Sequence, residues 1–196
     1  MLSTARRRRF GRGEVVFHEG DPAANVHMVV KGRIAVRITT PMGEVVTVEL
    51  VSAGGILGEL ALLTPGAVRS ATATALEPTE TLMLDQSVLS HLRTVDPAVN
   101  EVLVQLLVER VRQLDRRLVE ALYVRADGRI FRRLLELVEM YGELVPLTQE
   151  DLAGLAGTTR ATVNRVLRRE EQAGTVLLSR GRVRVTDRER LARLAR

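Results

Sequence analysis

The spacing of apolar residues changes once along the chain, near Pro97, and this change limits what the sequence can fold into. Between Phe10 and about Leu84, apolar residues form short runs separated by Gly, Pro and Asp, which is typical of β-strands joined by turns. From Pro97 onward they recur every three or four residues, the period of an amphipathic helix. The sequence therefore predicts an α+β protein with its strands first and its helices last.

The first part of the chain is predicted to form a closed β-sandwich or jelly roll. Residues 33–38 alternate polar and apolar side chains, and residues 45–50 follow after a turn that contains Pro and Gly. Short strands at this even spacing indicate an antiparallel β domain, which we expect over residues 10–95. Further strands are expected at residues 15–17, 27–30, 70–75 and 80–84.

A long dimerisation helix is expected over residues 96–124, with Asp127 and Gly128 marking where it ends. Its apolar residues form a heptad-like stripe, and such a stripe either covers the β domain or packs against a second copy of the chain. We favour the second arrangement, a homodimer. The stripe residues expected to make the dimer contact are Val104, Leu107, Val111, Leu114 and Leu118.

The last part, residues 125–196, is predicted to form a winged helix-turn-helix. A capping box that begins at Thr148 predicts one short helix. Gly157 suits a sharp turn between two helices, and Thr159 can cap the second of them. The apolar runs on either side of Gly181 favour a hairpin, which would be the wing.

The second short helix has an apolar face and a polar face that suits nucleic acid. Arg pairs with guanine, Asn pairs with adenine, and hydroxyls and helix-start amides suit phosphate oxygens. The alternative is a solvent-exposed helix face whose Arg residues have no function. That alternative does not explain why the helix caps, the glycine turn and the basic wing all indicate the same DNA-binding module. The residues expected to contact double-stranded DNA are Thr148, Gln149, Thr158, Thr159, Arg160, Thr162, Asn164, Arg165, Arg168, Arg180 and Arg182, with Arg169 and Arg184 as further polar members of the helix and the wing.

Charge is unevenly distributed along the chain. Residues 1–12 carry a net charge of +5, residues 13–123 carry −5, and residues 124–196 carry +5 again. A positive last third on a negative body favours binding of a polyanion such as DNA. A GC-rich genome would also encode this abundance of Arg, so composition by itself leaves both explanations open.

Residues 159–165, Thr-Arg-Ala-Thr-Val-Asn-Arg, resemble the Ser/Thr-Arg-Glu-Thr-Val-x-Arg pattern of the cyclic-AMP receptor protein and fumarate–nitrate regulator (CRP/FNR) family of bacterial transcription factors. The resemblance extends over nearly the whole chain. It implies that Arg160 and Arg165 read bases, with Thr159 and Thr162 on phosphates. Because Ala161 replaces the family's Glu and cannot accept a hydrogen bond from cytosine, we expect a different preferred half-site.

The candidate ligand site of the β domain lies near Gly58, where a short helical turn would offer free amides to an anion. Leu60 belongs to the same turn. Arg69 can pair with a phosphate, Ser70 can add a hydroxyl donor, and Glu59 can accept a hydrogen bond from a sugar. From the residues alone, a salt bridge between Glu59 and Arg69 explains the pair equally well.

The stretch from Gly58 to Ser70 is also similar to the cyclic-nucleotide-binding cassette of that family. The resemblance implies that Glu59 binds the ribose, and that Arg69 and Ser70 bind the cyclic phosphate. We therefore expect a cyclic nucleotide or another phosphate-bearing effector.

The adenine-reading residues of the family's cyclic-AMP sensors are not matched. Alignment at Gly128 places Leu114 and Asp115 at those positions. Leu114 offers no hydrogen bond, and an ionised Asp115 can accept but not donate. We expect cyclic AMP to bind weakly or not to be the effector.

The five Arg of residues 1–12 allow three interpretations: an arm that contacts DNA, a disordered segment, or part of a helix. Members of the family that the chain resembles carry a helix before the β domain. The resemblance implies that this chain begins after most of that helix. We therefore expect residues 6–9 to form its last turn.

Several function classes are excluded or disfavoured by composition. The chain has no Cys, which rules out disulfides, Cys-ligated zinc and Cys-held iron–sulfur clusters. His18, His27 and His91 are scattered, so no haem, metal or cupin-like catalytic site is expected, and we expect no enzyme activity. No apolar run is long enough to span a membrane, and no secretory signal is present. We expect a cytoplasmic regulator that binds DNA and RNA polymerase; the alternative is a ligand-independent regulator or an architectural DNA-binding protein with a vestigial pocket.

Overall fold

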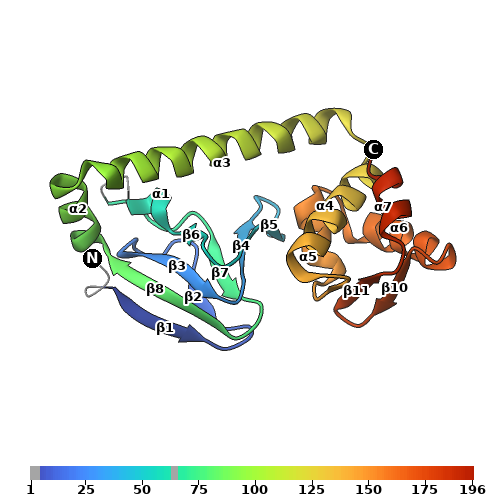
Figure 1. Ribbon diagram of the computed structural model, residues 1–196, viewed down its shortest axis with the longest axis horizontal. Coiled ribbons are helices and arrows are strands. Elements are labelled where there is room, and N and C mark those ends of the chain that lie inside the picture. The colour runs from blue at the N-terminus through green and yellow to red at the C-terminus, as the bar shows by residue number, and fades with distance from the viewer. Residues whose placement is uncertain (1–4, 63–65) are drawn as a thin grey trace. The chain divides into compact units, whose positions relative to one another are not determined.

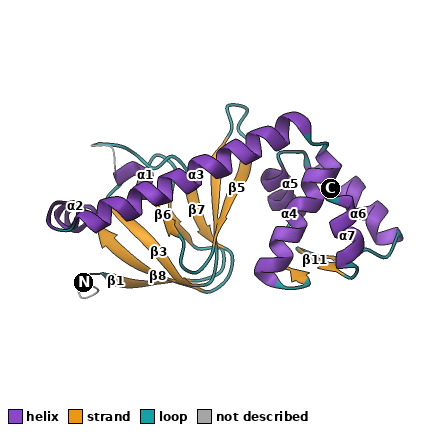
Figure 2. Ribbon diagram, turned by 45° about the horizontal axis from the view of Figure 1, so that its top comes forward, coloured by secondary structure: helices purple, strands orange, loops and turns teal. Residues whose placement is uncertain are grey.

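The computed structural model describes residues 5–62 and 66–196. The chain divides into two compact units, residues 1–109 and residues 110–196. Strands gather in the first unit, whereas the second is mainly helical (Figure 1, Figure 2). This is the α+β architecture that the change in apolar spacing predicts.

The order of the elements is as follows. The N-terminal unit contains β1 (Arg6–Phe10), β2 (Val15–Phe17), β3 (Asn25–Lys31), β4 (Ile34–Thr39), β5 (Val45–Val51), β6 (Ile56–Leu57), α1 (Glu59–Leu62), β7 (Thr72–Ala75), β8 (Thr79–Asp85) and α2 (Gln86–Val95). The helix α3 (Pro97–Tyr123) begins in this unit and ends in the next. The C-terminal unit adds α4 (Ala126–Tyr141), β9 (Leu144–Val145), α5 (Gln149–Ala156), α6 (Arg160–Gln172), β10 (Val176–Ser179), β11 (Arg182–Val185) and α7 (Arg188–Leu194).

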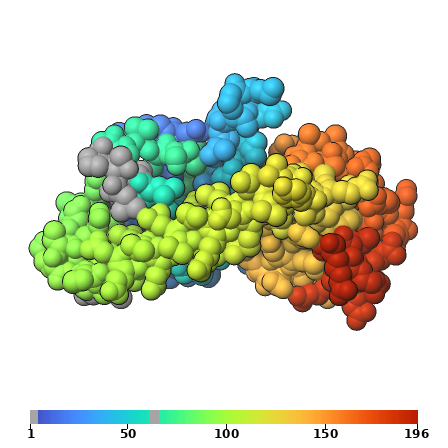
Figure 3. Space-filling model, turned by 90° about the horizontal axis from the view of Figure 1, so that it is seen from above, coloured from blue at the N-terminus to red at the C-terminus, as the bar shows by residue number. Residues whose placement is uncertain are grey.

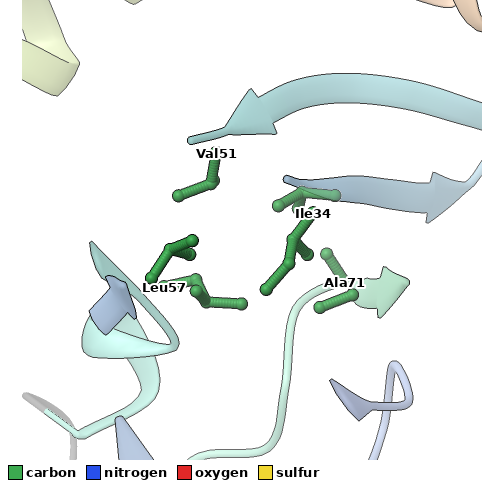
Figure 4. Close-up of a cluster of buried hydrophobic side chains, with 7 residues drawn as sticks. Ile34, Val51, Leu57 and Ala71 are labelled. Atoms are coloured by element: carbon green, nitrogen blue, oxygen red, sulfur yellow. The ribbon is translucent and has the colours of Figure 1, made fainter. Parts of the chain in front are cut away.

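The strands of the N-terminal unit form two antiparallel four-stranded sheets, in the orders β1-β8-β3-β6 and β2-β7-β4-β5. Apolar side chains from both sheets form one buried cluster, which includes Ile34, Val51, Leu57 and Ala71 (Figure 4). Burial of such side chains is the main force that holds two sheets together. The predicted β-sandwich is confirmed.

Residues 6–9 form a strand, so the expectation that they end a helix is wrong. β1 pairs antiparallel with β8 and places Arg9 opposite Glu80. Glu80 accepts hydrogen bonds from Arg9 Nε at 2.9 Å and from Arg7 Nη1 at 2.8 Å, while Phe10 is buried. These cross-strand ion pairs and the burial of Phe10 favour an edge strand over a helical turn.

A helix that was not expected from the sequence, α2, lies between the sandwich and α3. Its Leu89 forms a small buried cluster with Ala23, and Leu84 and Val99 pack against it. Val99 belongs to the first turn of α3. The start of α3 is therefore anchored to the N-terminal unit.

The long helix α3 is continuous over 27 residues, as predicted, but it ends at Tyr123. Asp127 and Gly128, which were expected to mark its end, lie in the first turn of α4 instead. The dipole of a helix stabilises an acidic residue in its first turn, which explains why Asp127 starts a helix rather than ending one.

Most of the apolar stripe on α3 is exposed in the single chain. Val104, Val111, Leu114 and Leu118 are between 56% and 59% exposed, whereas Leu107 is partly buried. Figure 3 shows the side of α3 that faces the viewer, coloured green to yellow.

The C-terminal unit contains the predicted winged helix-turn-helix. Thr148 caps α5 by accepting a hydrogen bond from Asp151 N at 3.1 Å, and Gly157 ends α5 in the left-handed conformation. Thr159 caps α6 by accepting a hydrogen bond from Thr162 N at 3.2 Å. β10 and β11 form the wing, and β9 and α7 are additions that were not expected.

The inward face of α6 is fully buried through Val163, Val166 and Leu167. Ile130 of α4 and Leu191 of α7 are also fully buried in this unit. Burial on one side leaves the opposite side of α6 available for contacts outside the chain. None of the described helices is long and apolar enough to cross a membrane.

Candidate functional site

The candidate ligand site of the N-terminal unit is built around Arg69, which is only 3% exposed. Its Nη1 donates to the carbonyl of Gly58 at 3.1 Å, and its Nη2 donates to the carbonyl and to Oδ1 of Asn25 at 2.6 and 2.9 Å. The guanidinium also lies 4.1 Å from the centre of the Phe17 ring. Its Nε is buried and has no hydrogen-bond partner within residues 5–62 and 66–196.

Gly58 is required at this site for two reasons. Its φ of +86° is a conformation that residues with a side chain rarely adopt. A Cβ at this position would also lie 2.3 Å from Nη1 of Arg69. The absence of a side chain therefore allows the buried guanidinium to lie against the backbone at the start of α1.

Glu59 brings an opposite charge into the same buried region. It is 2% exposed. Burial lowers the pKa of the Arg69 guanidinium below its ordinary value, whereas the carboxylates of Asp21 and Glu59 act in the opposite direction and raise it. Glu59 and Arg69 are thus close enough to interact, and both a mutual ion pair and a shared ligand are compatible with this placement.

His27 extends the polar network behind Arg69. Its Nε2 lies 3.0 Å from Oδ1 of Asn25, and its Nδ1 lies 2.9 Å from the hydroxyl of Thr81. Since the amide oxygen can only accept, Nε2 carries the proton and Nδ1 accepts from Thr81. Burial, with smaller contributions from the charges of Arg69 and Arg8, lowers the pKa of His27 to about 4. His27 is therefore a neutral residue that orients Asn25, and the described residues contain no group of three His, Asp or Glu that could hold a metal.

The other residues predicted for this site lie at its margin or on α3. Ser70 follows Arg69 in sequence and is exposed, and Leu60 is 42% exposed on α1. Leu114 and Asp115 are both exposed on α3.

Three residues of the network, Phe17, Asn25 and His27, were missed from the sequence. They lie on β2 and β3, distant from Arg69 along the chain, and become its neighbours only in the folded domain. No spacing pattern in the sequence could have identified them.

The predicted DNA-contacting residues gather on one face of the C-terminal unit. A cleft of about 540 Å³ lies between α5, α6 and the wing. Its lining includes six of the predicted residues, which are Thr148, Gln149, Arg160, Asn164, Arg180 and Arg182. Asn164 donates a hydrogen bond from Nδ2 to Oε1 of Gln149 at 3.0 Å, which joins α6 to the first turn of α5.

The remaining predicted residues lie at the start and along the exposed side of α6. Thr159 is exposed as the cap of α6, and Thr158 and Thr162 are partly buried beside it. Arg165 and Arg168 are each 63% exposed at the side chain. Their guanidinium groups are accessible to a polyanion.

Arg160, Arg165 and Arg168 of α6 each have an acidic neighbour. Arg168 pairs with Glu171 at 2.8 Å, and Arg160 lies 3.9 Å from Glu150. Arg165 contacts Asp127 of α4 at 3.3 Å. The basic face is therefore partly neutralised within the chain.

Comparison with known proteins identifies both units. A family model described as the cyclic nucleotide-binding domain matches residues 7–95, and one described as the Crp-like helix-turn-helix domain matches residues 128–194. The cyclic AMP receptor protein of Thermus thermophilus is 35% identical over 196 residues, which cover 99% of this chain and 90% of that protein. The chain belongs to the CRP/FNR family. It is a CRP-like transcription regulator and not an enzyme.

Other CRP/FNR relatives agree with this assignment. The CRP-like cAMP-activated global transcriptional regulator of Mycobacterium tuberculosis is 29% identical over 95% of this chain and 87% of that protein. A solved structure of a CRP/FNR-family transcriptional regulator from Thermus thermophilus has a TM-score of 0.82 and 26% identity, and covers 97% of this chain and 98% of its own. The fold and the family are thus supported over nearly the full length of the chain.

Proposed function

We propose that the protein is a homodimeric, sequence-specific DNA-binding regulator whose activity is modulated by a phosphate-bearing ligand in the β-sandwich. Residues 10–95 would be the sensor, residues 96–124 the dimerisation helix and residues 125–196 the DNA-binding domain. Its place of action would be the cytoplasm, where it would also contact RNA polymerase.

DNA binding is supported by the cleft between α5, α6 and the wing, which Arg160, Arg180 and Arg182 help to line, and this observation carries the proposal. A recognition helix presents its exposed side to base edges in the major groove. On α6 that side offers Arg160 and Arg165 as donors to guanine and Asn164 as a partner for adenine. Arg180 and Arg182 of the wing would contact the phosphate backbone.

Ligand binding is supported by Arg69 and Gly58. A buried guanidinium with an unsatisfied Nε, held against a glycine at the start of a helical turn, suits a phosphate oxygen. The names of two relatives, a cAMP-activated global transcriptional regulator and a cyclic AMP receptor protein, make a cyclic nucleotide the first candidate. Leu114 and Asp115 lack the donor groups that would recognise adenine, so we propose that cyclic AMP is not strongly preferred.

Isothermal titration with cyclic AMP and cyclic GMP tests the ligand. We expect both nucleotides to bind with similar affinity, and Arg69→Gln to abolish binding of both. The matched control is Arg37→Gln, because Arg37 lies on β4 outside the Arg69 network. A strong preference for cyclic AMP would contradict the proposed loss of purine recognition.

The alternative is a regulator whose pocket no longer binds a ligand. It is favoured by one observation, since both terminal nitrogens of Arg69 already donate to Gly58 and Asn25. Absence of heat for either nucleotide, together with DNA binding that does not respond to them, would support this alternative.

A further inference from the structure

Asp127 lies where it can influence DNA recognition, although it was expected only to end a helix. It belongs to the first turn of α4, and its two carboxylate oxygens contact two arginines of the recognition helix α6. Oδ1 accepts a hydrogen bond from Nη2 of Arg165 at 3.3 Å, and Oδ2 accepts one from Nη1 of Arg169 at 3.1 Å. The carboxylate thus bridges α4 to two consecutive turns of α6.

The two arginines are held differently. Arg169 is anchored from its other side as well, because its Nε donates to Oε1 of Glu170 at 3.1 Å, and Glu170 is buried. Arg165 is 63% exposed at the side chain, and Asp127 is its one ion-pair partner within the described residues. Arg169 therefore fixes the carboxylate in place, and Arg165 is the arginine that can leave it.

The end of the Arg165 side chain cannot serve two partners equally well. The nitrogens of a guanidinium that pair with a carboxylate are those that would pair with O6 and N7 of guanine or with a phosphate. A carboxylate beside DNA also repels phosphate. A guanine or phosphate that pairs with the edge of Arg165 carrying Nη2 would therefore compete with Asp127 for that nitrogen.

We propose that Asp127 is a specificity-determining residue that competes with DNA for Arg165. The inference rests on the proposed DNA-binding function. A guanine at the correct position gives Arg165 two hydrogen bonds in return for the one it leaves, whereas a phosphate on random DNA offers only a charge contact that Asp127 already provides. Asp127 therefore weakens binding to random DNA more than binding to a preferred site.

The test compares Asp127→Asn with the wild-type full-length chain. Preferred sites are first selected from a pool of randomised duplexes by the wild-type protein, and affinities for a selected and a random duplex are then measured by fluorescence anisotropy at several salt concentrations. We expect Asp127→Asn to raise affinity for the random duplex about tenfold in a dimer and to raise affinity for the selected duplex less. The slope of log K against log salt on the random duplex should steepen by about 0.9 for each arginine released.

Two controls and a second variant keep this result specific. Glu139→Gln removes a carboxylate of the same helix, where it pairs with Arg188 rather than with α6, and is expected to change affinity little. In an Arg165→Ala background, the gain from Asp127→Asn should be much smaller, because only the repulsion of phosphate by the carboxylate and its pair with Arg169 then remain to be removed. Asp127→Ser is a second variant, to be used if the Asp127→Asn protein does not fold.

The outcomes separate the inference from the proposed function. Equal gains on selected and random duplexes, a gain matched by Glu139→Gln, or a gain of undiminished size in Arg165→Ala would overturn the role of Asp127 while leaving DNA binding intact. A wild-type protein that selects no duplex at all would overturn the DNA-binding function and this inference with it.

Discussion

At the scale of single residues, Gly58 leaves the space that the buried guanidinium of Arg69 occupies. Replacing Gly58 with Ala places a Cβ 2.3 Å from Nη1 of Arg69 at a φ of +86°. We expect the free energy of unfolding to fall by about 1–3 kcal/mol from backbone strain alone, and by more because Arg69 must move. Chemical denaturation measures this loss.

Gly54 provides the matched control for that substitution. Its φ is +88°, but no atom lies within 4 Å of a Cβ built there. Gly54→Ala should therefore report the strain without the collision. If both variants lose the same stability, the close approach of Arg69 does not constrain Gly58.

His27 makes stability depend on pH. Its pKa is about 4 in the folded protein against an ordinary 6.5. Above pH 6.5 the residue is neutral in both states and its effect on stability is constant. As the pH falls below 6.5, the unfolded chain binds a proton that the folded chain does not, so the free energy of unfolding decreases until about pH 4, by about 3 kcal/mol at most.

Urea denaturation between pH 7.5 and pH 4.5, a window set by these two pKa values, measures this decrease. His27→Gln keeps an amide that can donate to Asn25 and removes the titrating group. We expect the variant to lose less stability than the wild type as the pH falls. The same pH dependence in both proteins would show that His27 does not titrate in this way.

Residues that follow one another in sequence were the easiest to place. Gly58 with Glu59, and the series from Thr159 to Arg165, were found because spacing along a turn or a helix fixes neighbours. His27 could not be found because its contact with Thr81 depends on the pairing of β3 with β8, and Asn25 could not be found because its partner Arg69 lies far away in the sequence.

At the scale of elements, two helix caps separate stability from DNA binding. Thr159 caps α6 through Thr162 N, and Asp187 caps α7 by accepting a hydrogen bond from Arg190 N. Replacing either cap with Ala should lower the free energy of unfolding by about 1 kcal/mol. Only Thr159→Ala should also weaken DNA binding, because α7 carries none of the proposed contacts.

Parallel denaturation and anisotropy measurements on both variants check this expectation. Thr159→Ser retains the hydroxyl and should restore most of both properties. An equal loss of DNA affinity in Asp187→Ala would mean that stability of the unit, rather than contact at α6, controls binding.

The elements that were predicted correctly are those with a strong internal pattern. α3 has a long apolar period, and α5 and α6 have caps and a glycine turn. β1, β9 and α7 are short, and β1 and β9 are held by pairing with distant strands. The run of Arg at residues 6–9 has no sequence pattern typical of a strand. It forms one because it pairs with β8, where Glu80 bonds Arg7 and Arg9.

At the scale of the whole molecule, the net charge of +5 includes many arginines that are paired with acidic side chains within the chain. Arg7 and Arg9 are offset by Glu80, and Arg165 and Arg169 by Asp127. The charge that DNA meets is therefore smaller than the count of arginines suggests. Contact with DNA must rearrange ion pairs as well as release counterions.

The exposed stripe of α3 gives the last prediction. Leu118 is 59% exposed in the single chain, and a glutamate there would place a charge in the proposed contact between two copies. We expect Leu118→Glu to shift the protein from dimer to monomer in analytical ultracentrifugation, and to weaken binding to a duplex with two half-sites far more than to one with a single half-site. Gln105→Glu makes the same change of charge beside the stripe and should remain dimeric. A dimeric Leu118→Glu variant would show that α3 does not hold the two copies together.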